Sequence, residues 1–257
     1  MRLTLILLAI ATAFGQPSTP PEQPGPQSWR FTCDYYYLDT KGNLGRRERL
    51  TARYTRSLPK DNIKWTDVEL ANGTEWADKF NPAEKRAFME GFSYPRAEVK
   101  NMLTPEFFRG FPPMAMIERN LVWDTHMLEG FAQDQFEHLK LNTPYHVPGA
   151  ENVEIGGAGA FRHRDLQLIW TGYSKRNAIE CAVIDYRAFF NTIDMKNPAM
   201  TLNGRSNYWG QIWVSLATRR IEYATLYEDV IGEMTFQGQD KPQTISVFRI
   251  GVFEPSK

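Results

Sequence analysis

The sequence predicts an α+β fold, a curved antiparallel β-sheet with a helical block inserted between an N-terminal strand pair and a C-terminal meander. Three observations predict it. Apolar and polar residues alternate from residue 29, helix-start signals and helical apolar spacing fill the middle, and alternation returns after residue 144.

The N-terminal strand pair is expected at residues 29–37 and 49–55. In the first segment, aromatic residues and Cys33 alternate with polar residues, which gives the segment one apolar face. Residues 39–43 have the composition of a turn, and alternation resumes after it. Two antiparallel strands therefore open the folded region.

The helical block is expected between residues 81 and 139. Asn81-Pro82 and Thr104-Pro105 each combine a capping residue with proline at the first helical position. After Pro113 a long helix is expected, which Gly130 interrupts or kinks. Its buried stripe recurs at three-, four- and seven-residue spacings, at Ile117, Leu121, Leu128, Ala132, Phe136 and Leu139.

The C-terminal meander is expected from residue 166 onward. Short apolar-alternating runs are separated by polar turns such as Ser174 to Asn177 and Gln237 to Pro242. The runs that predict strands are residues 166–171, 179–183, 208–215, 219–227 and 245–253.

The N-terminal region predicts export. Residues 1–15 combine one positive charge, a short apolar run and small residues, which is the pattern of a cleavable signal peptide. Residues 16–28 contain five prolines among polar residues and predict an extended linker. A single domain is expected over residues 29–257, in a protein released to the periplasm or the extracellular space.

Composition excludes several classes of partner. The 30 basic and 30 acidic residues give zero formal charge, which argues against nucleic acid as a partner. Outside the N-terminal region no apolar run approaches the roughly 20 residues that span a bilayer, so stable membrane insertion is not expected. The two cysteines, Cys33 and Cys181, could form one disulfide, but their apolar strand-like settings favour two buried free thiols.

Candidate catalytic residues are Asp124, His126 and His163. Asp124 with His126 suggests an acid/base pair, and the alternative is two polar residues on the solvated side of a helix. No G-x-S-x-G motif supplies a nucleophile. His126 and His138 would lie about 120° apart on one helix, so no metal site and no cofactor are expected.

Candidate ligand-binding residues are methionines and tryptophans. Methionine is unbranched and polarizable, and therefore adapts to irregular apolar ligands as well as to irregular cores. Met-rich helices against an aromatic sheet could line a cavity for a lipid or another apolar molecule. The candidates for this role are Met114, Met116, Met127, Trp170 and Trp213.

Two resemblances extend this interpretation. Residues 31–39, 208–215 and 221–230 resemble a family of exported bacterial proteins of uncharacterised function, which implies no activity or site. The strand around Gly210, Ile212 and Trp213, with the strand returning at Ile221, is similar to the periplasmic lipoprotein-carrier fold. That resemblance implies a curved half-barrel closed by helices around an apolar cavity, although the long helical block departs from it.

The sequence favours a non-enzymatic exported protein that binds an apolar ligand or an envelope partner between sheet and helices. The alternatives are a secreted hydrolase-like enzyme that uses an Asp/His pair, and a structural interaction module.

Overall fold

The computed structural model describes residues 26–57, 61–148, 152–154, 159–196 and 200–256. The predicted signal peptide and most of the predicted linker lie outside the described residues. One antiparallel sheet dominates the fold, in the strand order β4-β3-β2-β1-β13-β12-β11-β10-β8-β7. Its long strands are β1 (Gln27–Leu38), β2 (Leu44–Ser57), β3 (Asn62–Gly73), β9 (Leu166–Arg176), β10 (Ile179–Lys196), β11 (Met200–Ser215), β12 (Ile221–Phe236) and β13 (Gln243–Pro255).

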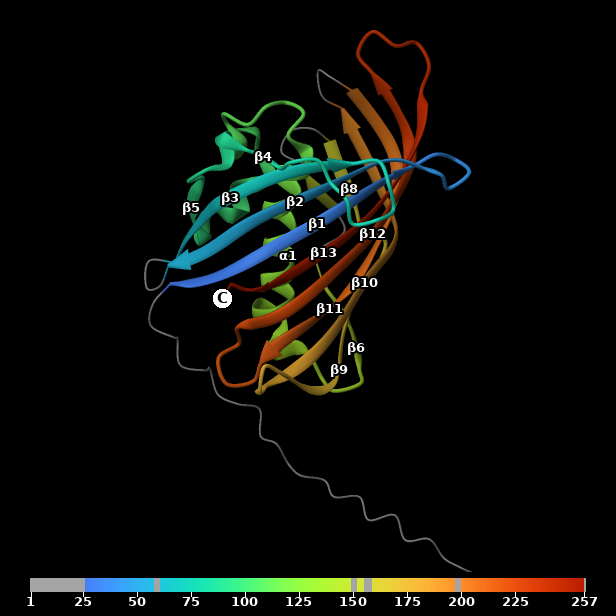
Figure 1. The fold of residues 1–257 in the computed structure, drawn as a ribbon. Helices are drawn as coiled ribbons and strands as arrows, with labels where there is room; N and C mark the ends of the chain where they lie inside the picture. Colours follow the sequence, from blue (N-terminus) through green and yellow to red (C-terminus); the bar gives the residue numbers. More distant parts are fainter. Residues whose placement is uncertain (1–25, 58–60, 149–151, 155–158, 197–199, 257) are drawn as a thin grey trace, which may run out of the picture.

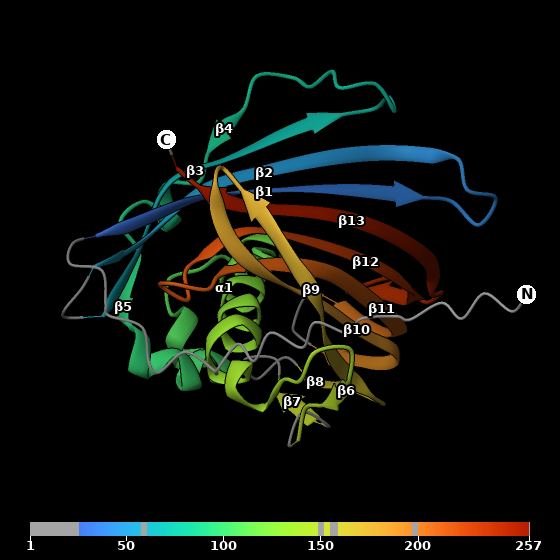
Figure 2. The same cartoon turned by 90° about the horizontal axis from the view of Figure 1, so that it is seen from below.

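The sheet arches over the α-helix α1 (Met116–Glu129), as Figures 1 and 2 show. We call the face toward α1 the inner face and the opposite face the outer face. β1 pairs with β13 along its length, so the first and last long strands are neighbours at the centre of the sheet. Short strands extend the edges, namely β4 (Glu84–Lys85), β5 (Ser93–Pro95), β6 (Pro144–His146), β7 (Asn152–Glu154) and β8 (Gly159–Arg162).

The predicted α+β class is wrong, because the described chain is mostly antiparallel sheet with α1 as its one α-helix. Around Asn81 no helix forms, and Glu84–Lys85 pair with β3 instead. Outside α1 and the segment that directly follows it, the helical part of the expected block consists of 3-10 elements, because its prolines interrupt any continuous α-helix. These elements are η1 (Ala87–Met89), η2 (Arg96–Leu103), η3 (Pro105–Phe108) and η5 (Phe136–His138).

The expected interruption at Gly130 is confirmed. The α-helix ends at Glu129, and a π-helical segment, η4 (Gly130–Asp134), continues the chain. The predicted apolar stripe from Ile117 to Leu139 is therefore divided among three helical elements, and most of its members still face the core.

The strand pair at the N-terminus and the C-terminal meander are confirmed by antiparallel pairing of β1 with β2 and of β9 through β13 in succession. β3 was not expected from the sequence. Its large buried side chains are Ile63, Trp65, Val68 and Leu70. The spacing changes from two residues to three across Asp67, where the backbone φ is 52°. That irregularity breaks the period of two on which strand prediction depends.

The core fills the space between the inner face and α1. Trp29, Phe31 and Tyr54 from the sheet pack with Leu121 and Leu128 of the helix. The expectation of two free, buried thiols is confirmed at Cys33 and Cys181. Within the described residues, none of the helices has the length and apolar character needed to cross a bilayer.

Candidate ligand-binding site

The outer face of β10, β11 and β12 carries two open pockets, of about 630 Å³ and about 610 Å³. They meet at two consecutive residues of β10, because Phe189 lines the larger pocket and Phe190 the smaller one. Together the pockets follow β11 from Trp213 to Asn203, ten residue steps that correspond to about 33 Å. We call this surface the outer trough.

Aromatic rings line the larger pocket. The Trp209 ring lies 5.8 Å from that of Tyr227 and 6.1 Å from that of Phe189. Trp213 and Tyr223 form a second pair, with 5.2 Å between ring centroids. Cross-strand register produces both tryptophan–tyrosine pairs, since β11 residues 209 and 213 stand opposite β12 residues 227 and 223.

Strained backbone lies where the two pockets meet. A bulge in β10 between Ala188 and Asn191 turns both phenylalanines outward, and Phe190 has a φ of 60° with 60% of its surface exposed. Positive φ is a genuine outlier for a bulky residue. Asn207 Oδ1 accepts a 2.7 Å hydrogen bond from the Phe190 amide, and the buried Asn191 side chain donates a 2.9 Å bond to the Ala188 carbonyl.

Such strain persists only where surrounding structure enforces it, and it concentrates at functional sites. The core gains little from a phenylalanine that is mostly exposed. The bulge therefore marks the junction of the two pockets as a candidate functional site.

Polar groups flank the rings in fixed positions. Gln211 donates a 2.8 Å hydrogen bond to the Asp185 carboxylate. Arg187 donates hydrogen bonds of 2.8 and 3.2 Å to the side-chain oxygen (Oε1) of Gln167. The whole trough has three carboxylates, Asp185, Asp229 and Glu233, against the two guanidinium groups of Arg187 and Arg205. Burial and the nearby Glu228 raise the pKa of Asp229.

Beneath the trough, a buried charge network ties the same strands to α1. Arg249 of β13 donates hydrogen bonds of 2.5 and 3.0 Å to Asp124 and a further bond to Glu228 of β12. Ser206 of β11 donates a 2.5 Å bond to Glu228. Burial raises the pKa of Asp124 to about 6, although Arg249 opposes the shift. The network fixes the inner side of the trough floor.

The three candidate catalytic residues have different partners, and none of them lines the outer trough. The carboxylate of Asp124 accepts hydrogen bonds from Arg249. His126 points to another side of α1, because residues two positions apart on a helix are separated by about 200° around its axis. Burial, then the neighbouring Arg96, lowers the pKa of His126. His163 lies after β8, with Nε2 2.7 Å from the Tyr208 hydroxyl. The structure therefore joins His163 to Tyr208.

The candidate ligand-binding residues fall into three groups. Met116 and Met127 lie on α1, half-buried against the core, while Met114 precedes the helix and is 55% exposed. Trp170 packs on Phe136, with ring centroids 5.5 Å apart. Trp213 is the candidate that lines the outer trough.

The sequence did not predict a role at this site for Phe189, Phe190, Trp209 or Tyr227. The signal that could have found two of them is the i, i+4 spacing of Trp209 with Trp213, and of Tyr223 with Tyr227, which puts each pair on one strand face. No group of three or more histidine, cysteine or acidic side chains within the described ranges is placed to hold a metal ion.

Comparisons with known proteins do not assign a family. No protein-family model and no curated protein matches the sequence. Among solved structures, one of lipovitellin, titled for its lipid–protein interactions, is similar with a TM-score of 0.42 and 13% identity, over 92% of this chain. The chain spans 26% of the length of that lipovitellin chain.

Proposed function

We propose that this protein is an exported binding protein that holds a carbohydrate chain along the outer trough. The observation that carries the proposal is found in the larger pocket, where the rings of Trp209 and Trp213 lie on either side of Gln211 on β11. Hydrogen-bonded amide, carboxylate and guanidinium groups from β9, β10 and β11 stand beside these rings. Sugar rings have apolar C–H faces and hydroxyl edges, so they require both kinds of group side by side. Ligand sites combine apolar contact with a few placed polar groups in this way.

Other extended ligands fit the trough less well. Single-stranded nucleic acid also stacks on aromatic rings, but it needs a positively charged groove along its phosphates. The trough instead has one more carboxylate than guanidinium groups. A purely apolar chain would leave the Asp185–Gln211 and Arg187–Gln167 pairs desolvated without new partners, which costs free energy.

Affinity electrophoresis tests the proposal. Gels would contain soluble glucan, mannan, xylan or alginate, and we expect at least one of them to retard the wild-type protein. Trp209→Ala should abolish the retardation. Tyr173→Ala, which removes an exposed aromatic ring outside both pockets, should not. Unretarded migration of the wild-type protein in every gel would contradict the proposal.

A second candidate function is binding of a lipid or other apolar molecule against α1, as the sequence analysis expected. It is favoured by the stripe that Met116, Trp123 and Met127 form on one helix face, next to a smaller apolar cluster of Ile193, Met195, Met200 and Leu202. Among the described residues, the buried indole Nε1 of Trp123 has no hydrogen-bond partner. Native mass spectrometry of protein purified from its own host would detect such a ligand, and an unliganded mass would contradict this second function.

A further inference from the structure

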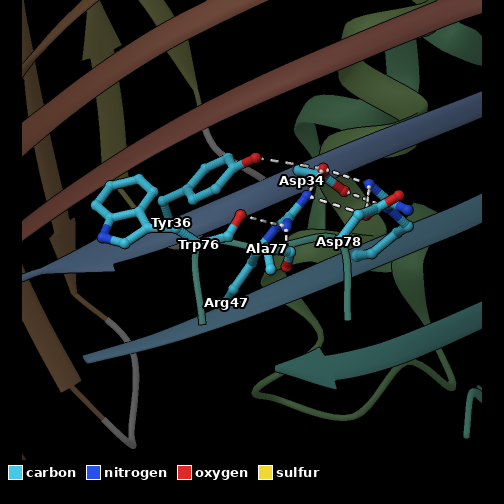
Figure 3. A network of polar contacts seen from close by, with 7 residues as sticks. Asp34, Tyr36, Arg47, Trp76, Ala77 and Asp78 are labelled. Atoms are coloured by element: carbon cyan, nitrogen blue, oxygen red, sulfur yellow. Dashed lines mark hydrogen bonds and ion pairs between the residues drawn. The ribbon is translucent and has the colours of Figure 1, made fainter. Parts of the chain in front are cut away.

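A loop between β3 and β4 is anchored to the outer face by charged groups. Arg47 of β2 donates a 2.6 Å hydrogen bond to Asp34 of β1, and it also donates to the carbonyls of Ala77 at 3.0 Å and Trp76 at 3.3 Å. Figure 3 shows these side chains converging on the loop from the two strands. Only 4% of the Arg47 side chain is exposed.

A second arginine reinforces the anchor. Arg49 bonds to Asp34 at 2.6 Å and to Asp78 of the loop at 2.8 Å. The guanidinium groups of Arg47 and Arg49 each lie 4.5 Å from the ring centroid of Phe80. Burial alone would raise the pKa of Asp34, but hydrogen bonds from Arg49 and Arg47 outweigh it and lower that pKa. The loop is therefore fixed at several points.

The anchored loop leaves a tryptophan exposed. Trp76 stacks on Tyr36 with ring centroids 5.5 Å apart and an interplanar angle of 21°, and 60% of its surface remains accessible. Burying arginine and aspartate costs desolvation energy even when they pair. A fold that needed only to cover its sheet would turn the indole inward, so the arrangement presents the ring to solvent.

A row of rings connects Trp76 to the outer trough. Tyr36 lies 6.4 Å from Phe248 of β13, its direct partner in the strand register, and Phe248 lies 6.4 Å from Trp209. The row therefore runs across the strands and meets the trough at its central tryptophan. From β11 to β1 the row crosses three strand spacings, or about 14 Å.

We infer that Trp76, supported from below by the buried ring of Tyr36, forms an accessory stacking subsite, which a long carbohydrate chain reaches from the outer trough by crossing Phe248. This inference rests on the proposed function and adds a length requirement to it. A disaccharide bound at Trp209 does not extend to Trp76, whereas a long oligosaccharide contacts both. Arg47 acts as a positioning residue, since it contacts the loop and not the ligand.

Calorimetric titration with two probes tests the inference. The probes are a disaccharide and a long oligosaccharide of whichever polysaccharide retards the protein in gels. Trp76→Ala should weaken binding of the long oligosaccharide about fivefold, the loss expected for one aromatic contact, and leave the disaccharide unchanged. Trp76→Phe keeps a ring and should restore most of the affinity. Arg47→Met should reproduce the length-dependent loss by releasing the loop.

The outcomes separate this inference from the proposed function. If Trp76→Ala binds both probes as the wild type does while Trp209→Ala binds neither, the accessory subsite is refuted and the trough stands. If Trp209→Ala also binds both probes normally, the trough itself is refuted. Thermal unfolding of each variant checks that the fold is intact, and Tyr173→Ala serves again as the exposed aromatic control.

Discussion

Arg249 on β13 and Asp124 on α1 are joined by two hydrogen bonds, of 2.5 and 3.0 Å, in a place where each residue is less than a tenth exposed. The same guanidinium group also bonds to Glu228 on β12. Two acids thus share one arginine at the interface between helix and sheet, directly beneath the outer trough. The pair fixes α1 under the strands that form the trough floor.

Removing the arginine should destabilise the fold strongly. Arg249→Met leaves Asp124 and Glu228 buried without a positive partner, and breaking a buried pair in this way costs about 3–5 kcal/mol. Urea denaturation would measure the loss. Arg30→Met on the exposed side of β1 is the matched control and should change the free energy of unfolding by less than about 0.5 kcal/mol. Equal effects of the two variants would contradict the assigned role.

Asp124 should make the protein more stable on mild acidification. Its folded pKa of about 6 lies above that of an unfolded aspartate, so between these values the native state binds more protons than the unfolded state. Its contribution to stability is therefore greatest below about pH 4 and declines as pH rises through about 6. The pKa of Asp34 is lowered in the folded protein, so its contribution to stability is instead lost as pH falls through that lowered pKa.

The measurement is the free energy of unfolding from about pH 5 to about pH 7.5, for the wild type and Asp124→Asn. We expect the wild type to gain stability relative to the variant as pH falls through this window. A difference between the two proteins that stays constant with pH would show that Asp124 does not titrate there.

Both thiols should be inert in the folded protein. Burial raises the pKa of Cys33 to about 12 and also raises the pKa of Cys181. The reactive thiolate is therefore scarce at neutral pH, and access is blocked as well. Ellman's reagent should label neither cysteine until urea unfolds the chain, when both react. Rapid labelling of the native protein would contradict the structure.

Replacing Phe190 by glycine should stabilise the fold and weaken ligand binding. Phe190→Gly removes the penalty of a positive φ and should stabilise the fold by about 1 kcal/mol, because glycine adopts this conformation freely. The same change should weaken carbohydrate binding. Phe189→Gly is the control, since it also removes a ring from the trough but relieves no positive φ. The prediction fails if both variants are destabilised equally.

The sequence predicts the parts of the sheet in which alternation is regular. β1 shows a clean period of two from Trp29 to Tyr35, and the residues on its apolar face are buried as expected. β3 was not predicted, because the irregularity at Asp67 shifts the alternation of apolar residues by one position. The helical block was overestimated because Asn81-Pro82 has the chemistry of a helix start, while tertiary pairing with β3 places the following residues in a strand.

The candidate site could be predicted only in part. Trp213 was singled out, but for a cavity on the inner face, whereas its side chain lies on the outer face beside Tyr223. Local sequence does not reveal that Trp209 meets Tyr227, because that contact depends on the register of β11 with β12. Phe189 and Phe190 are both exposed because of the bulge in β10, and no residue type in the sequence predicts that bulge.

The central claim is that the ligand binds the outer face, and nuclear magnetic resonance of the indole N–H groups tests it most directly. The protein has seven tryptophans, which probe both faces of the sheet. On titration with a polysaccharide that retards the protein in gels, we predict shifts for Trp209, Trp213 and Trp76, and none for the buried inner-face residues Trp29 and Trp65. Shifts confined to Trp123 and Trp170, with Trp209 and Trp213 unchanged, would contradict the account and place the ligand on the inner side of the sheet.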